Sequence, residues 1–399
     1  MKLKFSLLVA LSLTFTEDFT ACGYEKVIEE LRQVEEVDAK VVADILEFAP
    51  TSESTVEMTG IKDKFRTEIT IPSTIQVYGK EYKVTFNGDA FTESNVRNVK
   101  LTEGFTEIPE GAFADCRGLT SIEIPSSVTT IGSSAFYGCR GLTSIEIPSS
   151  VTTIGSSAFY GCSGLTSIEI PSSVTSIGNS AFEGCRGLTS IEIPASVTTI
   201  KGYAFSGCSG LTSIQIPSSV TTIEDWAFAG CWELTSVEIP SSVKSIGNST
   251  FFRCSGLTSI KIPSSVKSIG NYAFFCCSGL TSIKIPSSVT SIGESAFFDC
   301  RGLTSIEIPS SVTTIGSGAF SGCSGLTSIE IPSSVTTIED WAFAGCWELK
   351  SIEIPSSVTS IGEGAFENCD IDIVIDNSEE NVTVENGAFA DCKSVTWKR

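Results

Sequence analysis

LTSIEIPSSVTTIGSSAFYGC, residues 119–139, is the stretch that decides the fold, because it returns unchanged at residues 142–162. Variants of it continue to Cys369 at a constant spacing of 23 residues, without an insertion. Cys116 and Cys392 extend the same phase in both directions. A fixed period of about 20 to 50 residues is typical of a solenoid, in which each unit stacks on its neighbours.

Each unit predicts two short extended segments followed by a turn. In LTSIEI, the Leu and the two Ile have the spacing of a strand with one buried face, and the Glu points to the opposite face. The next residue is a proline, which ends this strand, and residues 128–131 form a second extended segment. Residues 133–138 are too few for a helix, so we expect one helical or 3-10 turn there. Stacking buries the Leu, Ile, Val, Phe and Cys positions in one elongated core, and the predicted fold class is a mainly β repeat solenoid.

The pattern LxxIxIPxxVxxIGxxAFxxC is very similar to the BspA-like leucine-rich repeat. The resemblance covers about residues 69–392, and it is specific because the pattern occurs eleven times in strict register. Ser127 stands near the place where many other leucine-rich repeats have a ladder of Asn, which fits the BspA-like subclass. The resemblance implies an exported or surface protein that adheres to host matrix proteins or to other cells.

The composition excludes several classes of function. The net charge of −21, from 47 acidic and 26 basic residues, disfavours nucleic acid and anionic membranes as partners. Histidine is absent, which removes Ser-His and Cys-His nucleophile pairs and His-based metal sites. The chain also has no glycine-rich phosphate loop after a parallel βα unit. We therefore expect no enzymatic activity, no cofactor and no bound metal.

Cysteine use follows the repeat. Of the 15 Cys residues, thirteen occupy one position of the unit, directly after the buried Phe region. The favoured interpretation is a ladder of buried, reduced thiols that act as small apolar side chains. Neighbouring rungs would lie within disulfide range, so pairing remains an alternative. A zinc site is disfavoured, because zinc needs several thiolates that converge on one point, whereas a ladder forms a line.

The N-terminus has the pattern of an export signal. Lys2 and Lys4 precede the apolar run FSLLVALSLTF, which is too short to span a membrane as a stable anchor. FTAC, ending at Cys22, loosely resembles a bacterial lipoprotein cleavage box, although Glu17 and Asp18 are atypical there. The hypotheses are ordinary cleavage, or cleavage before a lipidated Cys22. Both place the mature protein outside the cell or at its surface, including as an outer-membrane lipoprotein.

The chain order predicts one solenoid with a small N-terminal segment. Residues 24–48 have apolar side chains at intervals of three and four, which predicts an amphipathic helix. QVYGKEYKV, after the first IPSTI, is expected to form a hairpin-like insertion. The predicted regions are 1–22, signal peptide; 23–50, amphipathic helix; 51–68, linker and start of an N-terminal cap; 69–116, degenerate capping repeats; 117–369, eleven regular leucine-rich repeats; and 370–399, a C-terminal capping repeat.

An outward ladder of acidic side chains follows the first strand of the units. Equal charges on adjacent rungs weaken a sheet, and near-identical rungs do not define a specific site. The favoured interpretation is a solvated polar face copied by duplication; the alternative is a surface for a basic partner or for Ca²⁺. The ladder consists of Glu123, Glu146, Glu169, Glu192, Glu238, Glu307, Glu330 and Glu353.

This ladder is interrupted by a cluster of basic residues in neighbouring units, and outward-facing aromatic residues occur in the same region. Three units have a second Phe after the buried one, and three exposed Phe side chains in register would form an apolar ridge of the kind that marks interaction sites. EDWAFAGCWEL occurs twice, with a Trp where most units have Ser. These Trp residues either contact a partner or pack on adjacent turns. The predicted partner-binding residues are Lys244, Arg253, Lys261, Lys267, Lys284, Phe252, Phe275, Phe298, Trp226 and Trp341.

We therefore expect an exported, monomeric repeat protein that binds extracellular or host proteins, in adhesion if the resemblance holds. One alternative is a passive surface rod that provides length and a charged coat. Another is a module that binds cations or glycans through the Glu ladder or the exposed aromatic residues. No transmembrane span is expected in the mature chain, and a lipid at Cys22 would be its membrane anchor.

Overall fold

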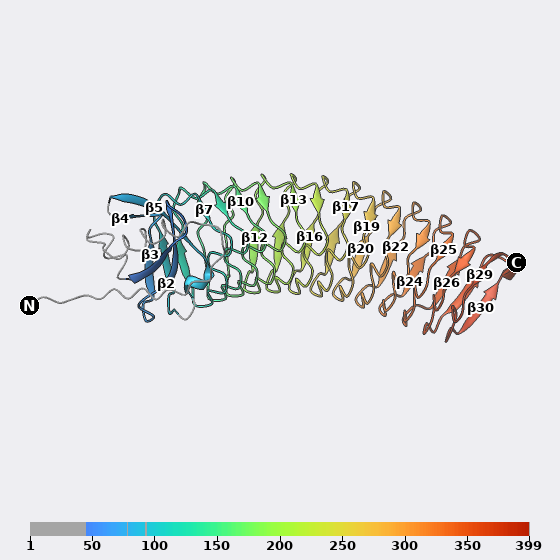
Figure 1. Cartoon of the computed structure of the whole chain (residues 1–399). Coiled ribbons are helices and arrows are strands. Elements are labelled where there is room, and N and C mark those ends of the chain that lie inside the picture. Colours follow the sequence, from blue (N-terminus) through green and yellow to red (C-terminus); the bar gives the residue numbers. More distant parts are fainter. Residues whose placement is uncertain (1–44, 78, 92–93, 399) are drawn as a thin grey trace, which may run out of the picture.

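The computed structural model describes residues 45–77, 79–91 and 94–398, and this part of the chain forms an elongated, curved solenoid (Figure 1). Each unit makes one turn, and residues one period apart lie side by side in parallel strands, as with Ser190 and Ser213. The predicted mainly β repeat solenoid is confirmed.

The first strand of each unit builds a ladder along one face. Its strands pair in the orders β3-β6-β8, β12-β14-β16-β18-β20-β22-β24 and β26-β28-β30. In the three-residue strands the middle residue is buried and its neighbours are exposed, as the alternating pattern predicts, except in β24, where Ile329 is only partly buried. The bounds are β3 Glu68–Ile71, β6 Asn98–Leu101, β8 Ser121–Glu123, β12 Ser190–Glu192, β14 Ser213–Gln215, β16 Ser236–Glu238, β18 Ser259–Lys261, β20 Ser282–Lys284, β22 Ser305–Glu307, β24 Ser328–Glu330, β26 Ser351–Ile354, β28 Asp372–Ile375 and β30 Ser394–Trp397.

The second extended segment builds another ladder, with the orders β11-β10-β9-β7 and β13-β15-β17-β19-β21-β23-β25-β27-β29. The 3-10 helix η2, Glu379–Asn381, lies just before its last strand. The bounds are β7 Glu107–Ile108, β9 Thr130–Ile131, β10 Thr153–Ile154, β11 Ser176–Ile177, β13 Thr199–Ile200, β15 Thr222–Ile223, β17 Ser245–Ile246, β19 Ser268–Ile269, β21 Ser291–Ile292, β23 Thr314–Ile315, β25 Thr337–Ile338, β27 Ser360–Ile361 and β29 Thr383–Val384.

The third segment of the unit is a run of hydrogen-bonded turns instead of a helical or 3-10 turn. The Tyr137 amide donates to Ser134 O at 3.0 Å within its own turn, whereas the Phe136 amide donates to Ala158 O of the next unit at 2.7 Å. Because alternate amides bond to the neighbouring unit, a continuous helix cannot form. Ser134 adopts a φ of +54° to make this alternation. We call this the turn face.

The core consists of side-chain columns that run the length of the solenoid. The buried Phe rings from Phe113 to Phe366 stack in sequence with centroids 5.2–5.6 Å apart. Offset stacking at such distances is favourable beyond the burial of area. All cysteines in the described residues are free thiols, and those from Cys139 to Cys369 at the ladder position are fully buried.

A ladder of serine hydroxyls takes the place of the Asn ladder of other leucine-rich repeats. Ser265 Oγ, for example, donates to Val243 O of the preceding unit at 2.6 Å. Near the C-terminal end Asn377 replaces this serine, and its Nδ2 donates to Ser356 O at 3.2 Å and to Val358 O at 3.4 Å. These side chains satisfy backbone carbonyls that the turn after Pro leaves unpaired.

The N-terminal end is closed by a sheet with the order β1-β2-β5-β4. Its strands are β1 Leu46–Pro50, β2 Thr55–Ile61, β4 Thr74–Val77 and β5 Lys80–Phe86, and the 3-10 helix η1, Gly88–Phe91, follows them. β4 and β5 pair antiparallel, as the hairpin expected for QVYGKEYKV requires.

The helix predicted over 23–50 is not confirmed: residues 46–50 form β1, and residues 1–44 lie outside the described residues. Residues 51–68, predicted as a linker and the start of an N-terminal cap, contain β2, which pairs antiparallel with β1 in the sheet that closes this end. The polar TSEST segment is the turn of this hairpin, and the alternation of Val56 and Met58 with polar residues, both buried, marks β2 as a strand. Among the described residues, no helix is long and apolar enough to cross a membrane.

Candidate partner-binding surface

Five aromatic rings from five consecutive units form a continuous row on the turn face. We call Tyr203, Trp226, Phe252, Phe275 and Phe298 the aromatic strip. Successive centroids are 5.7, 5.2, 4.9 and 4.6 Å apart. The rings lie outside the buried Phe column and are half-buried or exposed. The structure therefore joins Trp226 to the three predicted Phe residues in one surface.

The residue after each Phe of the strip has a left-handed backbone. Arg253, Cys276 and Asp299 have φ values of +57°, +56° and +58°, whereas the flanking units have glycine here, as at Gly230 and Gly322, both at +71°. A non-glycine residue in this conformation costs about 1 kcal/mol or more. Asp115, Asn368 and Asp391 have the same conformation in other units, so what distinguishes this region is that three consecutive units have a non-glycine residue here.

These strained residues line a groove of about 510 Å³ at the corner between the turn face and the first strand ladder. Arg301 Nε donates to Asp299 Oδ1 at 2.7 Å, and the Arg253 guanidinium lies 5.3 Å from the centre of the Phe252 ring. Trp232 is 57 % exposed beside them. The lining residues are Trp232, Arg253, Ser255, Cys276, Ser278, Asp299 and Arg301.

The Cys276 thiol in this groove is protonated at neutral pH. Burial and the Asp299 carboxylate raise its pKa, while the guanidiniums of Arg253 and Arg301 act in the opposite direction. Its Sγ lies 3.6 Å from Asp299 Oδ2 and donates to it. The groove therefore presents two guanidiniums, one of them neutralised by a carboxylate, next to apolar rings.

The predicted basic residues lie on more than one face. Lys261 and Lys284 are direct partners on β18 and β20, in the first ladder, and Lys261 Nζ lies 2.9 Å from Glu238 Oε1. The Lys267 amide donates to Lys244 O at 2.9 Å at the edge of the second ladder. The aromatic strip is on the turn face, so the structure does not bring these lysines and the Phe residues into one patch. Arg253 alone joins the strip directly.

The acidic ladder is solvated, and pairing along it varies. Glu146 and Glu169 are connected only by an isolated bridge. Glu330 ends β24 and Glu353 lies in β26, and these two strands belong to separate sheets. Glu307 and Glu330 are nevertheless paired on β22 and β24, and Lys261 and Lys284 on β18 and β20. Like charges on opposed residues therefore do not by themselves decide where the sheet is continuous.

Trp341, the counterpart of Trp226 in the second EDWAFAGCWEL block, is separate from the strip. It is 43 % exposed, and its ring lies against the backbone of Gly364 in the next unit, where an added Cβ would be 2.5 Å from the indole. The following unit has Glu367 where Phe252 meets Trp226. Trp341 therefore packs on an adjacent turn, which was the alternative interpretation of both Trp residues.

The groove was not predicted from the sequence, although two features of the sequence indicate it. Trp232 and Arg301 occupy a column that alternates between Arg, Ser and Trp in other units. The change from FYGC to FFRC, FFCC and FFDC replaces a glycine in three consecutive units. The importance of that glycine is apparent only once its positive φ is known.

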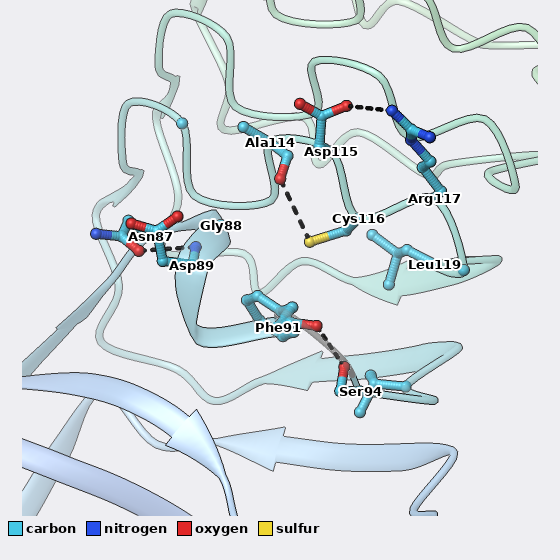
Figure 2. Close-up of a pocket in the computed structure, with 13 residues that line it drawn as sticks. Asn87, Gly88, Asp89, Phe91, Ser94, Ala114, Asp115, Cys116, Arg117 and Leu119 are labelled. Atoms are coloured by element: carbon cyan, nitrogen blue, oxygen red, sulfur yellow. Dashed lines mark hydrogen bonds and ion pairs between the residues drawn. The ribbon is translucent and has the colours of Figure 1, made fainter. Parts of the chain in front are cut away.

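A second cavity, of about 730 Å³, lies where η1 meets the unit that ends at Cys116 (Figure 2). It adjoins the N-terminal end of the cysteine ladder, and Figure 2 shows that its polar groups engage one another. The contacts are Asp115 Oδ1 to Arg117 at 3.7 Å, the Asp89 amide to Asn87 Oδ1 at 2.9 Å, and Ser94 Oγ to Phe91 O at 2.8 Å. In the described part of the chain, no group of three or more Cys, Asp or Glu side chains has the arrangement of a metal site. Cys22 lies outside the described residues.

The family follows from the repeat. The family model described as BspA type Leucine rich repeat region (6 copies) matches residues 84–208, 175–300 and 267–396. The chain belongs to the BspA-type leucine-rich repeat family. One structural neighbour of the chain is described as a leucine-rich cell surface protein.

Three solved structures of leucine-rich repeat proteins are similar to this BspA-type protein. A leucine-rich repeat protein from Bacteroides ovatus is 30 % identical, with a TM-score of 0.67, over 88 % of this chain and 89 % of that chain. A leucine-rich cell surface protein from Faecalibacterium prausnitzii is 32 % identical, with a TM-score of 0.54, over 89 % and 93 %. A leucine-rich repeat protein from Eubacterium ventriosum is 25 % identical, with a TM-score of 0.55, over 88 % and 94 %. No curated protein matches the sequence.

Proposed function

We propose that this chain is an exported, non-enzymatic surface protein that binds other proteins in adhesion, and that the aromatic strip and its groove form the contact surface. The observation that supports the proposal is the row of five neighbouring aromatic rings, which the consensus repeat does not require. Exposed Trp, Tyr, Phe and Arg are the side chains enriched at the centres of protein interfaces.

Export is proposed from the pattern of residues 1–22 alone, and attachment to a membrane from Cys22. Fractionation of the native producer, or of a bacterial host that expresses the full chain, tests both. Recovery in the cytoplasmic fraction would contradict export. Release of a Cys22→Ser variant into the medium, with the unchanged chain retained on membranes, would support the lipid anchor.

The binding proposal is tested with the full chain in a screen against extracellular-matrix and plasma proteins, at low and physiological salt. Phe275→Ser interrupts the middle of the strip. Tyr160→Ser is the matched control, because Tyr160 has the same position in its unit and stacks on Tyr137 at 4.8 Å, away from the strip.

Saturable binding that Phe275→Ser reduces and Tyr160→Ser does not would support this surface as the contact site. Binding that both variants leave unchanged would move the site elsewhere on the solenoid. If a folded, monomeric chain binds none of the proteins tested, a passive surface rod becomes the better description.

A further inference from the structure

Within the proposed function, we infer that the segment of the partner that docks here is acidic and contains large apolar side chains. The inference rests on that function and specifies its ligand chemistry. The relevant surface runs from the aromatic strip over the corner at Arg253 to Lys261 and Lys284 on the first ladder, whereas Lys244 and Lys267 lie at the second ladder and add to the local positive charge. We call the cations of this region the basic belt. The belt consists of Lys244, Arg253, Lys261, Lys267 and Lys284.

The charge of the chain changes sign at this place. Residues 239–293 contain the five belt residues and no Asp or Glu. The chain as a whole has 26 basic and 47 acidic residues, so the remainder has 21 basic and 47 acidic residues, a net charge of −26. Simple duplication of an acidic unit would not produce a region with a net charge of +5 in a chain that is otherwise strongly acidic.

Most of the belt is not neutralised by the protein itself. Lys261 forms an ion pair with Glu238, and both side chains are more than 70 % exposed. In the described part of the chain, the other four belt residues have no carboxylate within 4.0 Å. Exposed cations without partners attract a complementary anionic surface and orient it during association.

The belt begins where the aromatic strip lies. The guanidinium of Arg253 lies over the ring of Phe252, so cationic and apolar surfaces are continuous at the groove. From Arg253 the chain passes over the corner to Lys261 on β18, in the first ladder. A ligand that extends from the strip across this corner meets first aromatic rings and then lysines.

This order of surfaces favours a protein segment over a purely anionic polymer. A sulfated polysaccharide would use the cations and could stack a sugar ring on exposed Trp232, but it has no apolar side chains to pack against the strip, whose rings already contact one another. A peptide with aromatic and carboxylate side chains uses both, since apolar anchors at the centre and charges at the rim are the usual anatomy of a protein interface.

The experiment measures binding of the full chain to three probes at low and physiological salt: a random glutamate–tyrosine copolymer, poly-glutamate of the same length, and heparin. We expect the copolymer to bind about tenfold more tightly than poly-glutamate. Equal affinity for the two polypeptides, tighter binding of heparin, or binding of none of the three would overturn the inference.

The variants locate the contact. Lys261→Glu/Lys284→Glu should weaken the copolymer about tenfold at low salt, whereas Lys350→Glu, an equally exposed lysine outside the belt, should not change it. The double variant is expected to fold, because Glu occupies this position in eight other units. Phe275→Ser should weaken the copolymer and leave poly-glutamate unchanged. No effect of the double variant, with an unaltered melting temperature, would contradict the inference.

The experiments distinguish a failure of this inference from a failure of the proposed function. A matrix or plasma protein captured in the screen, whose binding the double lysine variant leaves unchanged, would preserve the function and overturn this ligand chemistry. A captured protein whose binding is lost in the same variant, and competed by the copolymer, would support both.

Discussion

The thiol of Cys254 donates a hydrogen bond to the carbonyl oxygen of Phe228, across 3.2 Å. The same bond joins the cysteines of other units to the Phe of the preceding unit, at 3.0–3.3 Å from Cys139 to Cys392. The ladder is therefore more than a column of small apolar side chains, because each thiol satisfies a buried carbonyl of its neighbour.

Cys254→Ala should lower the free energy of unfolding by about 1 to 3 kcal/mol, since it removes buried volume and one of the two donors to the Phe228 carbonyl, which also accepts from the Cys231 amide at 3.3 Å. Denaturant unfolding followed by circular dichroism measures the change. Cys276→Ala is the control, because that thiol is only half-buried and bonds to a side chain. Equal losses in the two variants would contradict a structural role of the backbone bond.

Stability should fall steeply at alkaline pH. Burial raises the pKa of Cys208, Cys254 and Cys323 from 9.0 to about 12 in the folded chain. Above pH 9 the unfolded chain loses these protons and the folded chain retains them, so the contribution to stability is complete below pH 9 and is lost as the pH rises to about 12.

Melting temperatures recorded from neutral pH upward test this expectation. The decline should begin near pH 9 and should be smaller in Cys254→Ala, which has one such thiol fewer. Alkylation of the native chain should modify Cys276 well before the ladder thiols. A melting temperature that stays constant through this range would show that the ladder thiols are not protected by folding.

Glu146→Lys should stabilise the solenoid by about 0.5 kcal/mol, because it places a cation between Glu123 and Glu169 on adjacent rungs. Glu307→Lys is the matched control with no net change expected, because it exchanges the attraction to Lys284 and the repulsion from Glu330 for the reverse. The stabilisation by Glu146→Lys should shrink at high salt, which screens exposed charges. Equal stabilisation by both variants would show that the pairing of charges on this face is unimportant.

The repeat made most of the fold predictable. Because the period is constant, the structure inferred for one unit applies to every copy. That inference needed only the alternation in LTSIEI and the turn after Pro125. The turn face was mispredicted because its alternate amides bond to a neighbouring unit, and propensity within one unit contains no such information. The hairpin of β1 and β2 was missed because its short strands follow a stretch with helical periodicity.

The candidate surface was predictable in its parts and not in its arrangement. Phe252, Phe275 and Phe298 stand in register in the sequence, and so does the break in the Glu ladder. Which of these lie on one face depends on where the chain turns. The groove forms where Arg253, Cys276 and Asp299 follow one another in three consecutive units, at a backbone conformation that most other units give to glycine.

That conformation leads to a prediction in which stability and binding change in opposite directions. Arg253→Gly should raise the free energy of unfolding by about 1 kcal/mol, because glycine adopts a φ of +57° without strain. It should also weaken partner binding, because the guanidinium over Phe252 is lost. Asn368→Gly is the matched control: Asn368 has the same position in its unit and a φ of +59°, but lies outside the strip. It should stabilise the chain and leave binding unchanged. If Arg253→Gly stabilises the chain and binding is retained, the strained residues of the groove do not contact the partner. The replacement of glycine in these three units then has no role in binding.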